Sequence, residues 1–197
     1  MKKTRAAILI SGRGSNMMAL VEASRAPDYP AESVCVVSNR PDAAGLDFAR
    51  DNGIDALTVD HKAFADRAAF EQALDAALRS RHVGLIALAG FMRVLSPAFI
   101  TRWDGRILNI HPSLLPAYKG LHTHERALAD HAEVHGCTVH LVTADLDAGP
   151  IILQAEVPVH PDDTPDTLSA RILKEEHRIY PQALAEVALA LQANTST

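Results

Sequence analysis

Three residues in the second half of the chain have side chains that suit acyl-type transfer. Asn109 and His111 stand two positions apart at the end of the apolar run 106–110. Because side chains alternate along a strand, both point to the same side. An amide N–H and a ring N–H that converge on one point can stabilise an oxyanion, usually the largest single contribution in this type of reaction. The pair is therefore a candidate oxyanion site.

Asp147 is a candidate partner for His111. It lies in the loop-like segment 145–150, Asp-Leu-Asp-Ala-Gly-Pro, and a carboxylate within a few ångströms of an imidazole favours the charged ring. These residues also have a structural interpretation, in which Asn109 caps a turn before Pro112, His111 fills a gap and Asp147 starts a Gly-Pro turn. Residue types and spacing alone leave both interpretations open.

The segment 12–16, Gly-Arg-Gly-Ser-Asn, follows the apolar run 6–11. Its two glycines permit a tight turn, and Ser15 or Asn16 can cap the helix that follows. Free amides at that helix start attract a phosphate, although the glycines can also make a turn and nothing more. Met17 stands at the third glycine position of the dinucleotide fingerprint, which argues against a nicotinamide cofactor.

Histidines gather in the second half of the chain, so a zinc site has to be weighed. They are His122, His124, His131, His135 and His140. The segment 131–135 is not H-E-x-x-H, and no cysteine lies at metal-binding spacing, so we expect no metal. No G-x-S-x-G elbow is present either, and this absence argues against a serine nucleophile.

Short β-branched apolar runs alternate with amphipathic segments in the first half of the chain. The expected strands are 6–11, 34–38, 56–59 and 84–89. The expected helices are 15–26, 42–53 and 66–81. Gly53 stands where a helix C-terminus needs a left-handed residue. Repeated strand, helix, strand order predicts an α/β fold with a Rossmann-like, doubly wound, mostly parallel sheet.

The second half is predicted to be β-rich and more irregular. The expected elements are a strand at 106–110, a Pro-broken loop, a short helix near 125–131 and strands near 137–142 and 151–157. The segment 165–191 has helical spacing, with a break expected at Pro181. Since neither a repeat nor a linker interrupts the pattern, we expect residues 1–197 to form a single domain.

Composition narrows the class of partner. The 197 residues carry a formal net charge of -5, which argues against broad binding to nucleic acid. No run approaches the ~20 apolar residues that span a bilayer, and the start of the chain turns polar too soon for a signal peptide. We therefore expect a cytoplasmic protein that acts on small molecules, binds no membrane, and is a monomer or a weak homodimer.

Cys35 and Cys137 are expected to be reduced core thiols.

Four segments together resemble the folate-dependent phosphoribosylglycinamide formyltransferases. They are ISGRGSN at 10–16, LAGFMRVLSP at 88–97, LNIHPSLLPAYKGLHTH at 108–124 and DLDAGPIILQ at 145–154. The resemblance implies the formyltransferase fold, with a phosphate- and nucleotide-binding half at about 1–100 and a folate-binding, catalytic half at about 101–197. It also implies 10-formyltetrahydrofolate as co-substrate and the amine of glycinamide ribonucleotide as acceptor.

The resemblance assigns roles to individual residues. Asn109, His111 and Asp147 are the implied catalytic residues. The implied substrate-binding residues are Gly14, Ser15, Asn16 and Glu176. The implied folate-binding residues are Arg67, Met92, Arg93, Val94 and Leu95, together with Asn109. Arg13 stands where the family often has a smaller polar residue, and its role stays open.

Two alternatives remain beside this hypothesis. Methionyl-tRNA formyltransferase and formyltetrahydrofolate hydrolase share the NIHPSLLP segment, but they usually carry an extra domain. The net negative charge of this chain also disfavours a tRNA substrate. A non-catalytic nucleotide-sensing domain would need the phosphate-binding turn, but it would have no use for Asn109, His111 and Asp147 together.

Overall fold

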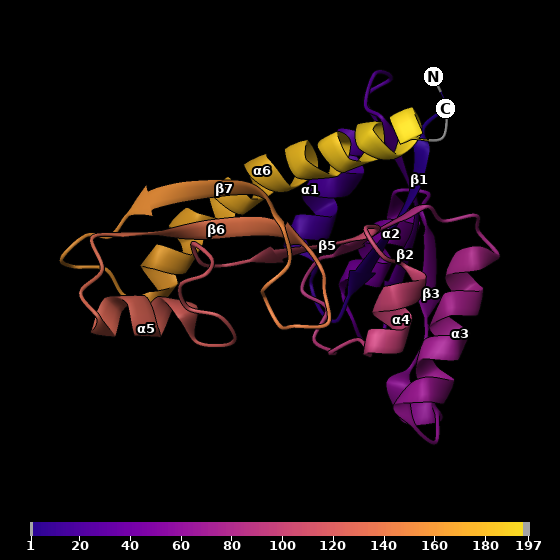
Figure 1. The fold of residues 1–197 in the computed structure, drawn as a ribbon, viewed down its shortest axis with the longest axis horizontal. Helices are drawn as coiled ribbons and strands as arrows, with labels where there is room; N and C mark the ends of the chain where they lie inside the picture. Colours follow the sequence, from indigo (N-terminus) through magenta and orange to yellow (C-terminus); the bar gives the residue numbers. More distant parts are fainter. Residues whose placement is uncertain (1, 195–197) are drawn as a thin grey trace.

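One sheet runs through the part of the chain that the computed structural model describes, residues 2–194, in the strand order β3-β2-β1-β4-β5-β6-β7 (Figure 1). The strands are β1 (Thr4–Ile10), β2 (Ala31–Ser38), β3 (Asp55–Thr58), β4 (Leu85–Leu88), β5 (Ile107–His111), β6 (Val134–Leu141) and β7 (Ile151–Pro158). The ends of the predicted domain, residue 1 and residues 195–197, lie outside the described residues.

The pairing of neighbouring strands changes from parallel to antiparallel after β5. The pairs from β3 through β5 are all parallel, whereas β6 pairs antiparallel with β5 and β7 antiparallel with β6. Parallel strands need crossover helices, and an antiparallel pair needs only a loop. The predicted Rossmann-like α/β sheet is confirmed, and the second half of the chain adds an antiparallel hairpin to it.

Helices lie on both faces of the sheet. They are α1 (Ser15–Ser24), α2 (Gly45–Asp51), the short 3₁₀ helix η1 (His61–Ala63), α3 (Arg67–Arg79), α4 (Pro97–Arg102), α5 (Thr123–Ala129) and α6 (Pro165–Asn194). The predicted helices are all present. The sequence did not predict η1 and α4, because three and six residues are too few to show a helical period.

Two apolar clusters fill the space between helices and sheet. Apolar residues of α1, α2 and α6 pack on one face, around Ile8, Ile10 and Leu108. Apolar residues of α3 and α4 pack on the other face, around Leu9 and Ile107. Because side chains alternate along a strand, consecutive residues of β1 feed opposite clusters. Both faces of the parallel part are thereby covered, as parallel sheets require.

The helix α6 lies along the sheet from the β6–β7 hairpin toward β1 (Figure 1). It continues through Pro181, so the predicted break there is wrong. An interior proline costs about 3 kcal/mol, but Tyr180 and Leu184 on either side are fully buried, and this packing outweighs the local cost. Although α6 has 30 residues, neither it nor any other helix within residues 2–194 has an apolar stretch long enough to cross a membrane.

Gly136 tests the close packing of the hairpin. A Cβ atom at this position of β6 would lie 2.0 Å from the carbonyl oxygen of Ala155 and 2.8 Å from Leu114 Cδ2. Because a backbone oxygen cannot yield as a flexible side chain can, Gly136→Ala is expected to lower the free energy of unfolding by about 1–3 kcal/mol. Urea denaturation measures the change.

Gly84→Ala is the matched control, since its Cβ would come no closer than 3.7 Å to Thr4 Cγ2. Its stability should stay within about 1 kcal/mol of wild type. Equal stability of the two variants would contradict the close approach at Gly136.

Candidate active site

The strand order reverses between β1 and β4, and ligands of open α/β sheets bind where the loops after two such strands diverge. Here the loop after β1 begins with Ser11, and the loop after β4 contains Met92. The Met92 N–H donates to Ser11 Oγ over 2.8 Å. This bond ties the two loops together at the switch point of the sheet.

Asn109 and His111 stand on β5, the next strand along the sheet. Ile107, two residues before Asn109, belongs to the core cluster under α3 and α4. By alternation, Asn109 and His111 continue the same face toward the carboxyl end of the strand. The His111 side chain is buried and Asn109 is half-buried.

Asp147 meets His111, as the sequence analysis hypothesised. Its Oδ2 atom lies 3.5 Å from His111 Nδ1 and accepts a hydrogen bond from the Gly120 N–H at 2.9 Å. Only 9% of Asp147 is exposed, so its charge depends on these partners rather than on water. Its backbone is left-handed, with φ 49°, in a turn before Gly149 and Pro150, so Asp147 both forms the turn and meets His111.

His140 is part of this cluster, and the sequence analysis missed its role. Its Cα is the cross-strand partner of Asn109. The Nδ1–H of His140 donates to the Leu141 carbonyl over 3.0 Å, which leaves Nε2 to accept from Asn109 Nδ2 at 3.2 Å. Burial lowers the pKa of His140, while the Leu141 carbonyl and Asp147 oppose that effect. A neutral His140 therefore fixes the orientation of the Asn109 amide.

The signal for His140 was the alternation of the run 137–142. Residues directly opposite on antiparallel strands share a face, so a residue paired with Asn109 must join the same site. The sequence does not reveal the register of β5 against β6, so it does not show that His140 pairs with Asn109.

Both ring nitrogens of His111 face acceptors. Its Nε2 lies 2.9 Å from the Tyr118 carbonyl, and its Nδ1 faces the Asp147 carboxylate at 3.5 Å. A ring with a proton on each nitrogen satisfies both acceptors. Tyr118 itself has a left-handed backbone, φ 52°, in the loop between β5 and α5. The Tyr118 carbonyl therefore occupies the position from which a substrate oxygen could accept the hydrogen bond of His111 Nε2–H.

A second pair of predicted site residues meets at the start of α1. Asn16 Nδ2 donates to Glu176 Oε2 over 2.7 Å, although the two residues are 160 positions apart in the chain. Glu176 is buried on α6, and burial raises its pKa, while the hydrogen bond from Asn16 lowers it. The pair joins the first helix to the last beside the glycine turn.

The expected capping of α1 by Ser15 or Asn16 is wrong. Gly14 is the N-cap, with a left-handed backbone at φ 71° and no side-chain cap. Ser15 and Asn16 are the first residues inside the helix, because the glycine makes the turn on its own and the Asn16 side chain pairs with Glu176. The first amides of α1 thus lack intrahelical acceptors, as a phosphate-binding turn requires.

Apolar side chains stand exposed on three loops at the carboxyl end of the sheet. Met92 is 69% exposed and Val94 is 68% exposed, and Leu121 and Leu146 are similarly open. Exposed large apolar groups that gather on neighbouring loops are typical of a ligand-binding surface. Leu95 differs from its neighbours, since it is buried in the core under α4.

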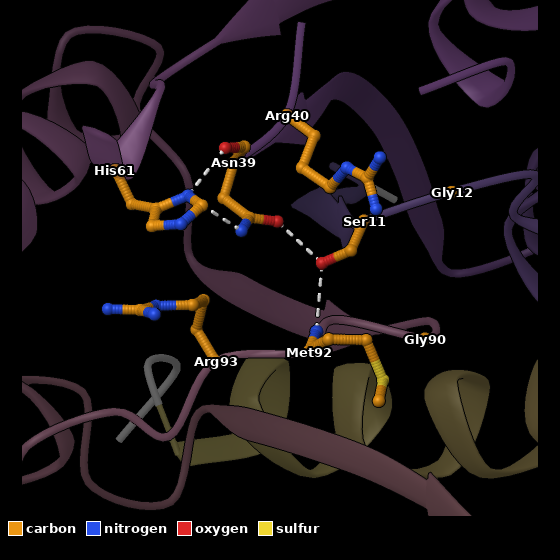
Figure 2. Close-up of a pocket in the computed structure, with 8 residues that line it drawn as sticks. All are labelled: Ser11, Gly12, Asn39, Arg40, His61, Gly90, Met92 and Arg93. Carbon is orange, nitrogen blue, oxygen red and sulfur yellow. Dashed lines mark hydrogen bonds between the residues drawn. The ribbon is translucent and has the colours of Figure 1, made fainter. Parts of the chain in front are cut away.

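Several predicted site residues lie outside the cluster of Asn109, His111 and Asp147. Arg67 is the exposed first residue of α3. Arg93 is exposed next to Met92, and Ser15 lies beyond Gly14 on α1. Together with Met92, Arg93 lines a pocket after β1 and β4 that does not include Asn109, His111 or Asp147 (Figure 2).

Residues 2–194 contain no group of three or more His, Cys, Asp or Glu side chains arranged to hold a metal ion. Cys35 and Cys137 are both free thiols buried in the core. Burial raises the pKa of the Cys35 thiol to about 11 and that of Cys137 to about 12, so neither is activated as a nucleophile.

Comparison with known proteins identifies relatives of this chain. The formyl transferase family matches residues 4–184. Phosphoribosylglycinamide formyltransferase of Escherichia coli strain K12 is 47% identical, over 90% of this chain and 84% of that protein. The trifunctional purine biosynthetic protein adenosine-3 of Bos taurus is 50% identical over 95% of this chain, which spans 18% of the length of that protein.

Solved structures agree with these relatives. The crystal structure of phosphoribosylglycinamide formyltransferase from Brucella melitensis superposes with a TM-score of 0.92 at 53% identity, covering 95% of this chain and 96% of that one. Glycinamide ribonucleotide transformylase 1 from Symbiobacterium toebii superposes with a TM-score of 0.93 at 48% identity, covering 95% and 89% of the two chains.

Two histidines, the buried His135 and the half-buried His124, pack next to Tyr118. The rings of His124 and His135 meet edge to face at 5.4 Å, and Tyr118 packs on His135 at 5.6 Å. His135 is 1% exposed, and its Nε2 has no hydrogen-bond partner. Burial lowers the pKa of His135 from 6.5 to about 4, with smaller contributions from His124 and His111.

The low pKa of His135 predicts a loss of stability in acid. Between pH 6.5 and 4 the unfolded chain binds a proton at this ring and the folded chain does not, so stability falls as the pH falls. From pH 7 to pH 5 this group should remove about 2 kcal/mol from the free energy of unfolding. Urea denaturation at both pH values measures the slope.

The His135→Gln variant should lack that part of the slope, whereas His160→Gln, at an exposed histidine, should keep it. A wild-type slope in His135→Gln would show that the buried ring does not cause the acid sensitivity.

Proposed function

The chain belongs to the formyl transferase family, and from this premise we propose that it transfers the formyl group of 10-formyltetrahydrofolate to the amine of glycinamide ribonucleotide. The products are formylglycinamide ribonucleotide and tetrahydrofolate, and the reaction belongs to de novo purine synthesis in the cytoplasm. The main support is the likeness to the Escherichia coli phosphoribosylglycinamide formyltransferase over most of both chains.

The two substrates enter from the two halves of the chain. The ribonucleotide phosphate binds the free amides at the start of α1, around Gly14, Ser15 and Asn16. Glu176, held by Asn16 at 2.7 Å, accepts hydrogen bonds from the ribose. This arrangement suits a small phosphorylated amine, because one helix start offers few donors beyond those that a single phosphate needs.

The folate lies along the loop after β4. Met92 and Val94 present exposed apolar side chains, on which a flat aromatic ring can pack, while Leu95 anchors the loop in the core. Arg93 and Arg67 supply positive charge for the carboxylates of the folate. The pterin end then reaches toward Asn109 and the buried Asp147 cluster.

Transfer proceeds directly from folate to amine. The neutral amine attacks the formyl carbon and gives a tetrahedral intermediate, whose oxyanion accepts hydrogen bonds from Asn109 and His111. For this to happen, the formyl oxygen must replace the Tyr118 carbonyl as the acceptor of the His111 Nε2 proton. Asp147 keeps the His111 ring charged, and His140 holds the Asn109 amide in place.

Binding energy from both ends of the site orients the reactants. Fixing two substrates in reacting geometry can supply ~7–11 kcal/mol relative to a free encounter. The folate nitrogen leaves with a proton and the amine loses one, and a relay through His111 or a water in the Asp147 loop accounts for both steps. No formyl group becomes attached to the enzyme.

The direct test follows release of tetrahydrofolate from 10-formyltetrahydrofolate with and without glycinamide ribonucleotide. We expect release that depends on the ribonucleotide, without added metal or nicotinamide. Release at the same rate without the amine would indicate a formyltetrahydrofolate hydrolase instead. Binding of the ribonucleotide without any release would indicate a nucleotide-sensing domain.

Asp147→Asn tests the catalytic cluster. The amide keeps the size of the carboxylate but loses the charge that favours the His111 imidazolium, so kcat should fall by about 100-fold or more, a typical cost of losing an oxyanion donor. The dissociation constant for glycinamide ribonucleotide should stay within about threefold of wild type. Turnover at the wild-type rate would remove Asp147 from the mechanism.

A further inference from the structure

Gly45, the first residue of α2, is buried against the glycine turn that precedes α1. Its N–H donates to the Gly12 carbonyl over 3.1 Å, so the loop after β2 is joined to the loop after β1. The sequence analysis did not single out Gly45, because it lies outside the segment 12–16 that carries the phosphate-binding pattern. Its contacts nevertheless all lead to that segment or to the residues on either side of it.

A side chain at position 45 does not fit without a displacement. A Cβ atom on Gly45 would lie 2.9 Å from the Arg13 carbonyl oxygen. It would also lie 2.5 Å from Ile10 Cδ1 and 3.0 Å from Met17 Cε. The ends of these two side chains can rotate, but the carbonyl oxygen belongs to the turn itself. Gly45 does not have a left-handed backbone, so close approach, and not conformational freedom, requires glycine here.

Both backbone contacts of Gly45 fix peptide units whose N–H groups face the other way. In a planar trans peptide unit, the carbonyl and the N–H that follows it point in opposite directions. The Gly12 carbonyl, which accepts from Gly45, is therefore rigidly joined to the Arg13 N–H. The Arg13 carbonyl, which lies against Gly45, is joined in the same way to the Gly14 N–H. A movement of either carbonyl turns the N–H on the far side of its peptide unit.

These N–H groups lead into the open start of α1. Gly14 is the N-cap, and no side chain caps the helix. The first amides of the helix have no acceptor inside it, and a phosphate binds such a helix start when several N–H groups point at it together. The direction of the Gly14 peptide unit therefore affects how well the turn and the helix start can bind one phosphate.

We propose that Gly45 is a positioning residue for the phosphate of the ribonucleotide. It holds the peptide units of residues 12–14 so that their N–H groups face the phosphate. The inference rests on the proposed function, which places the phosphate at this turn. Gly45 acts through the turn and does not itself touch the substrate, so α2 contributes to substrate binding without lining the site.

The test compares two acceptors in Gly45→Ala, glycinamide ribonucleotide and glycinamide riboside, which lacks the phosphate. The added Cβ atom should displace the Arg13 carbonyl and lower kcat/KM for the ribonucleotide by about tenfold, the value of one hydrogen bond to a charged group. The kcat/KM for the riboside and the KM for 10-formyltetrahydrofolate should be unchanged. Inhibition by ribose 5-phosphate gives a second readout, since its inhibition constant should rise by the same factor.

Ala49→Gly is the matched control. Ala49 lies one turn further along α2, is also buried and packs in the apolar cluster around Ile8 and Ile10. Glycine at this position destabilises the helix but leaves the contacts between Gly45 and the turn in place. The variant should keep the wild-type ratio of kcat/KM for the ribonucleotide and the riboside.

Ile10→Val/Gly45→Ala separates the turn from the core, and it serves as the test if crowding of the core keeps Gly45→Ala from folding. Valine lacks the Cδ1 atom, which lies nearest to the added Cβ atom, whereas the Arg13 carbonyl remains in the way. The double variant should therefore show the same loss with the ribonucleotide.

Three outcomes would overturn the inference. They are an unchanged kcat/KM for the ribonucleotide in Gly45→Ala, an equal loss with the ribonucleotide and the riboside, and a wild-type value in the double variant. The second result would indicate general damage to the fold, and the third would assign the effect to the Ile10 side chain. Absence of transfer by the wild-type protein would instead refute the proposed function, so the two failures are distinct.

Discussion

The buried carboxylate of Asp147 constrains the loops and strands around the carboxyl end of β5. A carboxylate that is 9% exposed loses most of its hydration, and the protein must supply hydrogen bonds in place of water. Here they come from the Gly120 N–H, with the His111 ring close to the same carboxylate oxygen. These partners belong to a loop and to a strand, so the carboxylate can be buried only when both are in place.

This requirement is consistent with the change from parallel to antiparallel pairing after β5. A further parallel strand would need a crossover helix before it, and that helix would cover the face on which Asn109 and His111 stand. The antiparallel β6 instead places His140 directly opposite Asn109 and leaves the face to loops. Loops can present both the Tyr118 carbonyl and Asp147 to one imidazole ring.

The sequence predicted the parallel half well because its signals are local. Alternation and apolar runs give strands and helices, and Gly53 has the left-handed backbone that its place after α2 suggested, φ 71°. The prediction was wrong where tertiary contacts decide: α6 continues through Pro181 because the residues around it are buried, and Asn16 pairs with Glu176 instead of capping α1.

The candidate site shows the same division between local and distant information. Asn109 and His111 could be found from strand alternation and residue type. Their contacts with Asp147 and His140 could not, since these depend on a left-handed residue in a loop and on the register of two antiparallel strands. Residue types at the ends of apolar runs predicted which side chains could react, whereas the fold decides which of them meet.

The hydrogen bond between Met92 and Ser11 links the two proposed substrate sites. Ser11 begins the turn that leads to the open amides of α1, and Met92 begins the wall on which the folate would lie. Movement of either loop alone would break this bond and leave the buried Ser11 hydroxyl without one partner, at a cost of about 1–3 kcal/mol. The two loops are therefore held at a fixed separation, so in the proposed reaction the positions of the amine and of the formyl donor relative to β5 would depend on each other.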